Sequence, residues 1–220
     1  MARLIFDLDG TLVHSAPTIA AAANGMLGEI GRTALPLAAV LGYVGHGMRR
    51  LVEDVLNETG GVPEAGVDHH LTIYKRIYFA DPLTGTELYP GVAEALATLA
   101  AAGHDLAVCT QKPDKPSLEI LEGFGLMPPI SVLTGGDSLP GVLKPDPRLF
   151  RHAADQLPPG PEVMIGDSET DARTAANAGA PFLLHLGGYN HVPPETLGAF
   201  ATFSDWREAP ALIEAALARA

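Results

Sequence analysis

Residues 4–14 read LIFDLDGTLVH, an apolar run that leads into two aspartates one residue apart and then a glycine. The run predicts a short buried strand over residues 3–7. Asp7 closes this strand and Asp9 lies on the turn that follows, so two carboxylates come together where their charges repel. Such a pair becomes useful when a metal ion and a phosphate group share its surroundings.

Four more short apolar runs follow much later in the chain, and helical stretches alternate with them. The runs cover residues 105–110, 131–135, 162–167 and 181–187, and helices are expected over residues 92–103, 115–125, 147–157 and 169–179. The alternation of strands and helices indicates right-handed crossovers. We therefore predict an α/β fold with a doubly wound, Rossmann-like parallel sheet.

The stretch between the first two predicted strands carries no strand signal but shows helical periodicity. Apolar side chains recur at helical spacing over residues 19–30, 48–56 and 67–78. Roughly seventy residues are too many for a simple strand-to-helix connection. We expect residues 14–85 to form an inserted α-helical cap domain over the carboxyl edge of the sheet, and residues 1–13 and 86–220 to form the α/β core domain.

The composition limits the class of protein. The chain of 220 residues has 14 lysines and arginines against 26 aspartates and glutamates, a formal net charge of −12. Such a charge disfavours nucleic acid and anionic membranes as partners, and no apolar run is long enough to span a bilayer. The single cysteine, Cys109, excludes an internal disulfide and, without a signal-peptide pattern, fits a reducing cytoplasm. We expect a cytoplasmic monomer or homodimer.

Polar side chains collect at the predicted carboxyl ends of the strands, where parallel sheets bind their ligands. They are Asp7, Asp9, Thr110, Gln111, Lys112, Lys144, Asp167 and Asp171. Carboxylates without histidine or cysteine partners form a hard oxygen site that suits Mg²⁺. A carboxylate is repelled by a phosphate dianion at about 4 Å by about 8 kcal/mol at an effective dielectric constant near 20. A divalent ion and one lysine carry enough positive charge to cancel that repulsion.

The chemistry that fits these groups is phosphoryl transfer. We expect Asp7 to be the nucleophile that forms an aspartyl-phosphate, and Asp9 to act first as general acid and then as general base. Asp167 would hold Mg²⁺ together with Asp7, and the backbone carbonyl of Asp9 could add a ligand. Asp171, four residues after Asp167, could hold metal-bound water.

The remaining candidates are expected to bind the substrate. Thr110 and backbone N–H groups of residues 7–10 would hold the transferring oxygens, and Lys144 would neutralise the phosphate and orient Asp7. Gly10 allows close approach of the backbone. Free N–H groups at a helix start can bind anions, which makes the loop around His46 a candidate in the cap. The other candidate substrate-binding residues are Thr11, Gln111, Lys112 and Arg49.

Each of these residues, taken alone, also has an ordinary structural explanation. An aspartate after a buried strand often caps a helix. A threonine at a strand end is usually structural, and a lysine before a proline is usually a solvated loop charge. The convergence of several strands on one edge with the right chemical groups argues against these explanations.

Four motifs carry a resemblance to a known family: DLDGTL (7–12), VCTQKP (108–113), LKPDP (143–147) and MIGDSETD (164–171). Together they resemble the haloacid dehalogenase superfamily of phosphatases, in this order and over essentially the whole chain. The resemblance implies a doubly wound α/β core with a helical cap after the first motif. It also supports the roles given above to Asp7, Asp9, Thr110, Lys144 and Asp167.

Within the superfamily, the chain is most similar to the bacterial phosphoglycolate phosphatases. The similar stretches are SAPTIAAAAN (15–24), YVGHGMRRLVEDVL (43–56), ELYPGVAEAL (87–96) and GGYN (187–190). This resemblance implies 2-phosphoglycolate as the leading substrate. Three residues depart from the usual pattern: His14 replaces an aspartate, Gln111 an asparagine, and His46 the asparagine of a V-G-N-G stretch.

Three other functions remain open at this point. A phosphomutase related to β-phosphoglucomutase would use the same nucleophile, although Thr11 is commoner in the phosphatases. A dehalogenase would need neither metal nor second acid, and a binding module without catalysis would not need every chemical position filled. Within the phosphatases, another metabolite phosphate or pyrophosphate is the alternative substrate.

Overall fold

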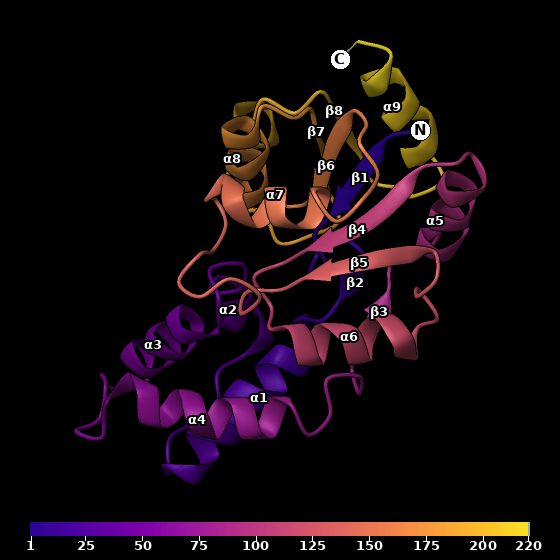
Figure 1. Cartoon of the computed structure of the whole chain (residues 1–220). Coiled ribbons are helices and arrows are strands. Elements are labelled where there is room, and N and C mark those ends of the chain that lie inside the picture. Colours follow the sequence, from indigo (N-terminus) through magenta and orange to yellow (C-terminus); the bar gives the residue numbers. More distant parts are fainter. Residues whose placement is uncertain (220) are drawn as a thin grey trace. The chain divides into compact units, whose positions relative to one another are not determined.

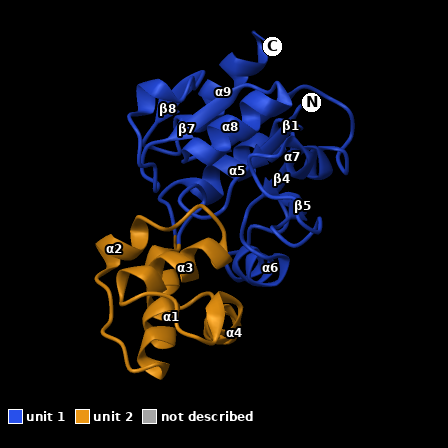
Figure 2. Cartoon of the chain, turned by 90° about the vertical axis from the view of Figure 1, so that its left-hand side faces the viewer, with its two compact units in different colours: residues 1–14, 88–220 blue, residues 15–87 orange. Residues whose placement is uncertain are grey.

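The computed structural model describes residues 1–219. The chain divides into two compact units: unit 1 contains Met1–His14 and the residues from Leu88 onward, and unit 2 contains Ser15–Glu87 (Figure 2). The short strands β2 (Val13–His14) and β3 (Glu87–Leu88) pair with each other where the chain passes between the units.

Unit 1 is built on a six-stranded sheet in which neighbouring strands pair in parallel (Figure 1). In spatial order its strands are β5 (Ile130–Thr134), β4 (Asp105–Cys109), β1 (Arg3–Phe6), β6 (Glu162–Gly166), β7 (Phe182–His185) and β8 (Ala201–Phe203). The chain starts in the middle of the sheet and winds outward in both directions. The predicted doubly wound α/β fold is confirmed.

Helices cover both faces of this sheet. One face packs against α7 (Pro147–Ala154) and α8 (Glu169–Ala178), and the other against α5 (Val92–Ala101), α6 (Asp114–Gly123) and α9 (Ala209–Leu217). Successive side chains of a strand point to opposite faces, so Leu4 and Phe6 lie in one core cluster and Ile5 in the other. After Arg3, strand β1 is apolar at every position because both of its faces are buried.

The register of the sheet brings three strand ends level. Phe6 of β1 lies opposite Val108 of β4 and Ile165 of β6. The chain continues past each of these strands by only one or two residues before it reaches a polar side chain. The residues after β1, β4 and β6 consequently meet at one edge of the sheet.

Local signals in the sequence explain where the two helices next to this edge begin. Helix α7 starts with Asp146, whose carboxylate accepts the N–H of Arg148, followed by Pro147 in the first turn. Helix α8 starts with a capping box between Ser168 and Asp171, and it ends at Gly179 in the left-handed conformation, with φ of 71°.

Unit 2 consists of helices α1 (Ala16–Glu29), α2 (Leu37–Leu41), α3 (Met48–Glu58) and α4 (Gly66–Tyr78). Helix α1 packs on α2, α3 and α4, and α3 also packs on α4. The guanidinium of Arg32 donates to the carbonyls of Leu56 and Gly61 and so satisfies the carboxyl end of α3. Among residues 1–219, no helix has both the length and the apolar character needed to cross a membrane.

Candidate active site

Asp7 and Lys144 form the centre of the group at the sheet edge. The backbone N–H of Asp7 donates to the carbonyl of Ile165 at 2.9 Å, which continues the hydrogen bonding between β1 and β6. The ammonium group of Lys144 donates to Asp7 Oδ1 at 2.8 Å and to Asp171 Oδ1 at 2.6 Å. The Lys144 side chain is only 3% exposed. A lysine that arrives from the loop before α7 is thus held between two carboxylates.

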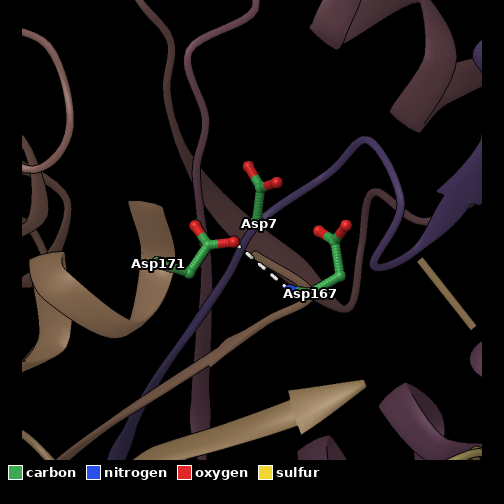
Figure 3. A group of neighbouring side chains, drawn as sticks. All are labelled: Asp7, Asp167 and Asp171. Carbon is green, nitrogen blue, oxygen red and sulfur yellow. Dashed lines mark hydrogen bonds between the residues drawn. The ribbon is translucent and has the colours of Figure 1, made fainter. Parts of the chain in front are cut away.

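Three buried carboxylates surround this point. Asp7, Asp167 and Asp171 each offer an oxygen atom, and these atoms lie within 4.8 Å of one another. Figure 3 shows the three side chains gathered at the ends of β1 and β6 and in the first turn of α8. Such a group of hard oxygen donors is suited to a divalent cation such as Mg²⁺.

The two oxygens of Asp171 are already engaged. Oδ1 accepts the Lys144 ammonium group, while Oδ2 accepts the backbone N–H groups of Asp167 and Ser168 at 3.2 and 3.1 Å and the Ser168 hydroxyl at 2.6 Å. Asp171 therefore ties the loop after β6 and the start of α8 to Lys144. With four donors, one of them an ammonium group, Asp171 is a poorer candidate for a direct metal ligand than Asp167, which accepts two neutral donors.

Asp167 is fixed by groups from two other segments. The hydroxyl of Thr11 donates to its Oδ1 at 2.9 Å, and the backbone N–H of Tyr189 donates to its Oδ2 at 2.7 Å. Two glycines make room for it. A Cβ on Gly188 would lie 2.2 Å from Cβ of Asp167, and a Cβ on Gly10 would lie 2.3 Å from its Oδ2. Only glycine fits at both positions without moving the carboxylate.

Asp9 and Thr110 lie on the loops beside this group. The ammonium group of Lys112 donates to Asp9 Oδ1 at 2.6 Å, and the Lys112 side chain is 2% exposed. Thr110 is buried, and its hydroxyl oxygen accepts the backbone N–H of Lys112 at 3.3 Å. Gln111, half-buried, stands between them. Lys112 thus pairs with Asp9 much as Lys144 pairs with Asp7.

The charges of the group do not balance. Asp7, Asp9, Asp167 and Asp171 face two lysines, so the ionised group carries two negative charges in excess. Burial, together with the neighbouring carboxylates, raises the pKa of Asp7 to about 6 despite Lys144, and raises the pKa of Asp167 well above its usual range. A divalent cation would remove this excess, and the all-oxygen donor set fits one.

Burial lowers the pKa of Lys144, but the carboxylates of Asp171 and Asp7 overcome this and hold the pKa above its ordinary value. The lysine is therefore a permanent cation at the centre of the site. It supplies fixed positive charge at the place where the sequence predicts the phosphate.

Two residues predicted to bind substrate use their donors within unit 1. The N–H of Gly10 donates to the carbonyl of Val13 at 2.8 Å, and the N–H of Thr11 donates to that of Leu8 at 3.3 Å. The Thr11 hydroxyl serves Asp167. In the structure these donors shape the turn and position a carboxylate, and binding of substrate by Gly10 and Thr11 stays a prediction.

His46 and Arg49 belong to unit 2. His46 is exposed, two residues before α3, and Gly47 at the helix start has φ of 85°. The guanidinium of Arg49 lies 3.0 Å from the carboxylate of Asp68 on α4 and 4.0 Å from that of Glu53. Contact of His46 or Arg49 with substrate stays a prediction.

Sequence reasoning missed several residues that hold the loop of residues 7–12. The GGYN stretch provides Gly188 and the Tyr189 N–H, a role that its similarity to one subgroup of the superfamily does not indicate. The hydroxyl of Tyr189 lies 3.1 Å from Nδ1 of His14. His185 and Trp206, which belong to none of the sequence motifs, each place a ring nitrogen against a backbone carbonyl of this loop.

Comparison with known proteins gives consistent matches. Residues 1–179 match the family model described as haloacid dehalogenase-like hydrolase. A phosphoglycolate phosphatase of Cereibacter sphaeroides (strain ATCC 17029 / ATH 2.4.9) is 42% identical over 219 residues, which cover 99% of this chain and 100% of the relative. One from Rhodospirillum rubrum is 41% identical over 212 residues, with 92% and 87% covered.

A solved structure shows the same fold. The crystal structure of a predicted phosphoglycolate phosphatase from Haemophilus somnus 129PT superposes with a TM-score of 0.88 at 29% identity, and 96% of each chain is covered. The similarity therefore spans both units of the chain in sequence.

Proposed function

Because the chain belongs to the haloacid dehalogenase-like hydrolases, we propose that it is a Mg²⁺-dependent phosphatase that works through an aspartyl-phosphate on Asp7. The observation that carries this proposal is the contact of Asp7 with Lys144 beside two further buried carboxylates. A buried carboxylate next to a fixed cation, with oxygen donors that suit a second cation, is what attack on a phosphate dianion requires.

The first step transfers the phosphoryl group to the protein. A carboxylate oxygen of Asp7 forms a bond to phosphorus while the bond to the ester oxygen breaks, and Asp9 gives its proton to that leaving oxygen. Lys144 neutralises the transferring oxygens, and the Thr110 hydroxyl donates to one of them. Asp9 must carry a proton at this moment, so its ion pair with Lys112 has to loosen when substrate enters.

The second step hydrolyses the aspartyl-phosphate and regenerates Asp7. Asp9, now a carboxylate, removes a proton from water, and the water oxygen bonds to phosphorus as the bond to Asp7 breaks. The products are inorganic phosphate and a free Asp7. Because one residue serves both steps, it leaves the cycle in the protonated state in which it entered.

Asp7 and Asp167 would hold Mg²⁺ with the backbone carbonyl of Asp9, and the bound ion would supply the positive charge that offsets the carboxylates and the phosphate. Asp171 would keep Lys144 in place.

We propose 2-phosphoglycolate as the substrate. Support comes from relatives of that name that are about 42% identical over nearly the full length of the chain. Its carboxylate gives it a second anionic end, for which Lys112 is a candidate cation in unit 1. Arg49 of unit 2 stays a candidate from the sequence alone. His46, which departs from the usual pattern, is the residue we expect to tune this choice.

A phosphate-release screen over a few dozen metabolite phosphates tests the proposal. We expect 2-phosphoglycolate to give the highest kcat/KM, and hydrolysis to stop with EDTA and return with Mg²⁺. Hexose 1-phosphate belongs in the screen, because isomerised product without phosphate release would indicate a phosphomutase instead. Metal-independent turnover would contradict the charge argument.

A further inference from the structure

Two consecutive backbone carbonyl groups of the loop that carries Asp9 accept hydrogen bonds from ring N–H groups of distant residues. Nδ1 of His185, at the end of β7, lies 2.9 Å from the carbonyl oxygen of Gly10. Nε1 of Trp206 donates to the carbonyl of Thr11 at 3.2 Å. The two rings lie next to each other, with centroids 5.9 Å apart.

The chemistry of the contact fixes the state of His185. A carbonyl oxygen can only accept a hydrogen bond, so the hydrogen must sit on Nδ1. Burial lowers the pKa of His185, although the bond to Gly10 opposes this. The ring is therefore neutral at physiological pH, with its proton on the nitrogen that faces the loop.

Packing keeps the ring in this orientation. The His185 side chain is almost completely buried, and its centroid lies 4.6 Å from that of Tyr89 and 5.4 Å from that of Phe203. Gly187 passes close by: a Cβ there would come within 2.9 Å of the imidazole. A ring enclosed in this way cannot turn to exchange its nitrogens without opening the cluster.

The Gly10 carbonyl accepts its hydrogen bond from a residue outside the loop. The N–H groups of Thr11, Leu12 and Val13 all donate to the carbonyl of Leu8, which ties the loop internally. In the peptide that follows Gly10, the Thr11 N–H bond to Leu8 is long, at 3.3 Å, and Gly10 has φ of 84° and no side chain. The 2.9 Å contact with His185 is therefore the shorter of the two hydrogen bonds that set the plane of this peptide. Asp9 directly precedes this flexible residue.

We propose that His185 is a positioning residue that sets the direction of the Asp9 carboxylate by holding the Gly10 carbonyl. The inference rests on the proposed function, in which Asp9 protonates the leaving oxygen. Without the imidazole donor, the buried carbonyl has to turn toward another partner, and the peptide planes on either side of Gly10 turn with it. Asp9 then no longer meets the leaving oxygen.

Three variants test this. His185→Phe keeps an aromatic ring but removes the donor, whereas His185→Asn places an amide N–H near the position of Nδ1. Phe203→Leu is the matched control, because it loosens the same ring cluster but removes no hydrogen-bond donor to the loop. Thermal unfolding of all three shows whether they fold and how far stability differs.

The informative readout is the dependence of kcat/KM on the leaving group, since this parameter reports the steps up to cleavage of the ester bond. Alkyl phosphates need a proton at the leaving oxygen, whereas aryl phosphates with acidic phenols do not. We expect His185→Phe to lose about tenfold or more on alkyl phosphates, against less than about threefold on activated aryl phosphates. His185→Asn should recover part of the loss, and Phe203→Leu should show no such difference. Equal losses on both substrate classes would overturn the proposal.

A spectroscopic measurement separates failure of this inference from failure of the proposed function. Nitrogen-15 NMR of the imidazoles should show His185 with a hydrogen on Nδ1 and none on Nε2, at any level of activity. The opposite tautomer would overturn the inference even in an active phosphatase. A protein that hydrolyses no phosphomonoester but shows the expected tautomer would instead overturn the proposed function, and with it the role assigned to Asp9.

Discussion

The ammonium group of Lys144 lies 2.8 Å from the carboxylate of Asp7, although 137 residues separate the two in the sequence. The sheet brings β1 to its centre, and the loop before α7 delivers the lysine to the same edge. This pair is the contact on which the proposed chemistry depends most directly, and it gives the first prediction.

Lys144→Met should lower kcat/KM by about a thousandfold, because it removes the cation that offsets both the phosphate and Asp7. The variant also leaves the buried carboxylates of Asp7 and Asp171 without their cation, which we expect to cost about 3 kcal/mol of unfolding free energy. Lys115→Met is the control, since Lys115 forms an exposed pair with Glu119 on α6. Steady-state kinetics and urea unfolding measure both effects, and a Lys144→Met protein with near-normal turnover would remove Lys144 from the mechanism.

Asp7→Asn should abolish turnover while the fold persists, because an amide cannot form the acyl-phosphate. The wild-type protein, quenched in acid during turnover, should carry one phosphoryl group in the peptide that contains Asp7, and the variant should carry none. Mass spectrometry of the quenched digests makes this comparison. Residual hydrolysis by a fully folded Asp7→Asn protein would refute the nucleophile assignment.

The stability of the metal-free protein should depend on pH through Asp7. Burial raises its pKa to about 6 in the folded protein from an ordinary value of 3.8, so the folded state binds the proton more tightly than the unfolded state does. The resulting stabilisation is present below the unfolded pKa and is lost as pH rises through the folded pKa. For Asp7 alone the loss is on the order of 3 kcal/mol, and Asp167, whose pKa is raised too, adds to it.

Added Mg²⁺ should therefore raise Tm more at about pH 8 than at about pH 5, since the ion binds ionised carboxylates. Melting curves with EDTA and with excess Mg²⁺, each recorded at both pH values, give the four Tm values to be compared. Asp167→Asn should reduce the Mg²⁺ effect at about pH 8. The same Mg²⁺-induced shift at both pH values would argue against a metal site at these carboxylates.

Gly188→Ala should weaken metal binding and lower stability by about 1–3 kcal/mol, because its Cβ would lie 2.2 Å from Cβ of Asp167 and force that residue to move. Gly28→Ala, in the last turn of α1, meets nothing within 4 Å and should be neutral or slightly stabilising. Mg²⁺ titration followed by thermal shift compares the two. An unchanged Mg²⁺ affinity in a folded Gly188→Ala protein would show that Asp167 tolerates the displacement.

The sequence predicted the sheet and its polar edge well, for a physical reason. Strands buried on both faces are continuous apolar runs, and parallel topology then places their carboxyl ends together, so Asp7, Thr110 and Asp167 could be grouped without a structure. Strand β8 was missed because ATF (201–203) is too short to show a pattern. The five-residue helix α2 was missed for the same reason.

The groups that hold the carboxylates in place were harder to foresee. The Tyr189 contact to Asp167 comes from a backbone N–H, which every residue except proline possesses, so no residue type signals it. His185 has no ligand spacing around it, and its role follows from the tautomer that one carbonyl imposes. Such contacts depend on the path of loops, and side-chain periodicity carries no information about that path.

Asp171 links the start of a helix to the charge of the site. Its carboxylate completes the capping box of α8 and at the same time anchors Lys144. A protein engineer who exchanged it for a better capping residue in order to raise heat tolerance would release the lysine from one of its two anchors. Thermal stability and catalytic turnover therefore both depend on Asp171. A substitution that raises Tm at this position has to be checked for its effect on kcat.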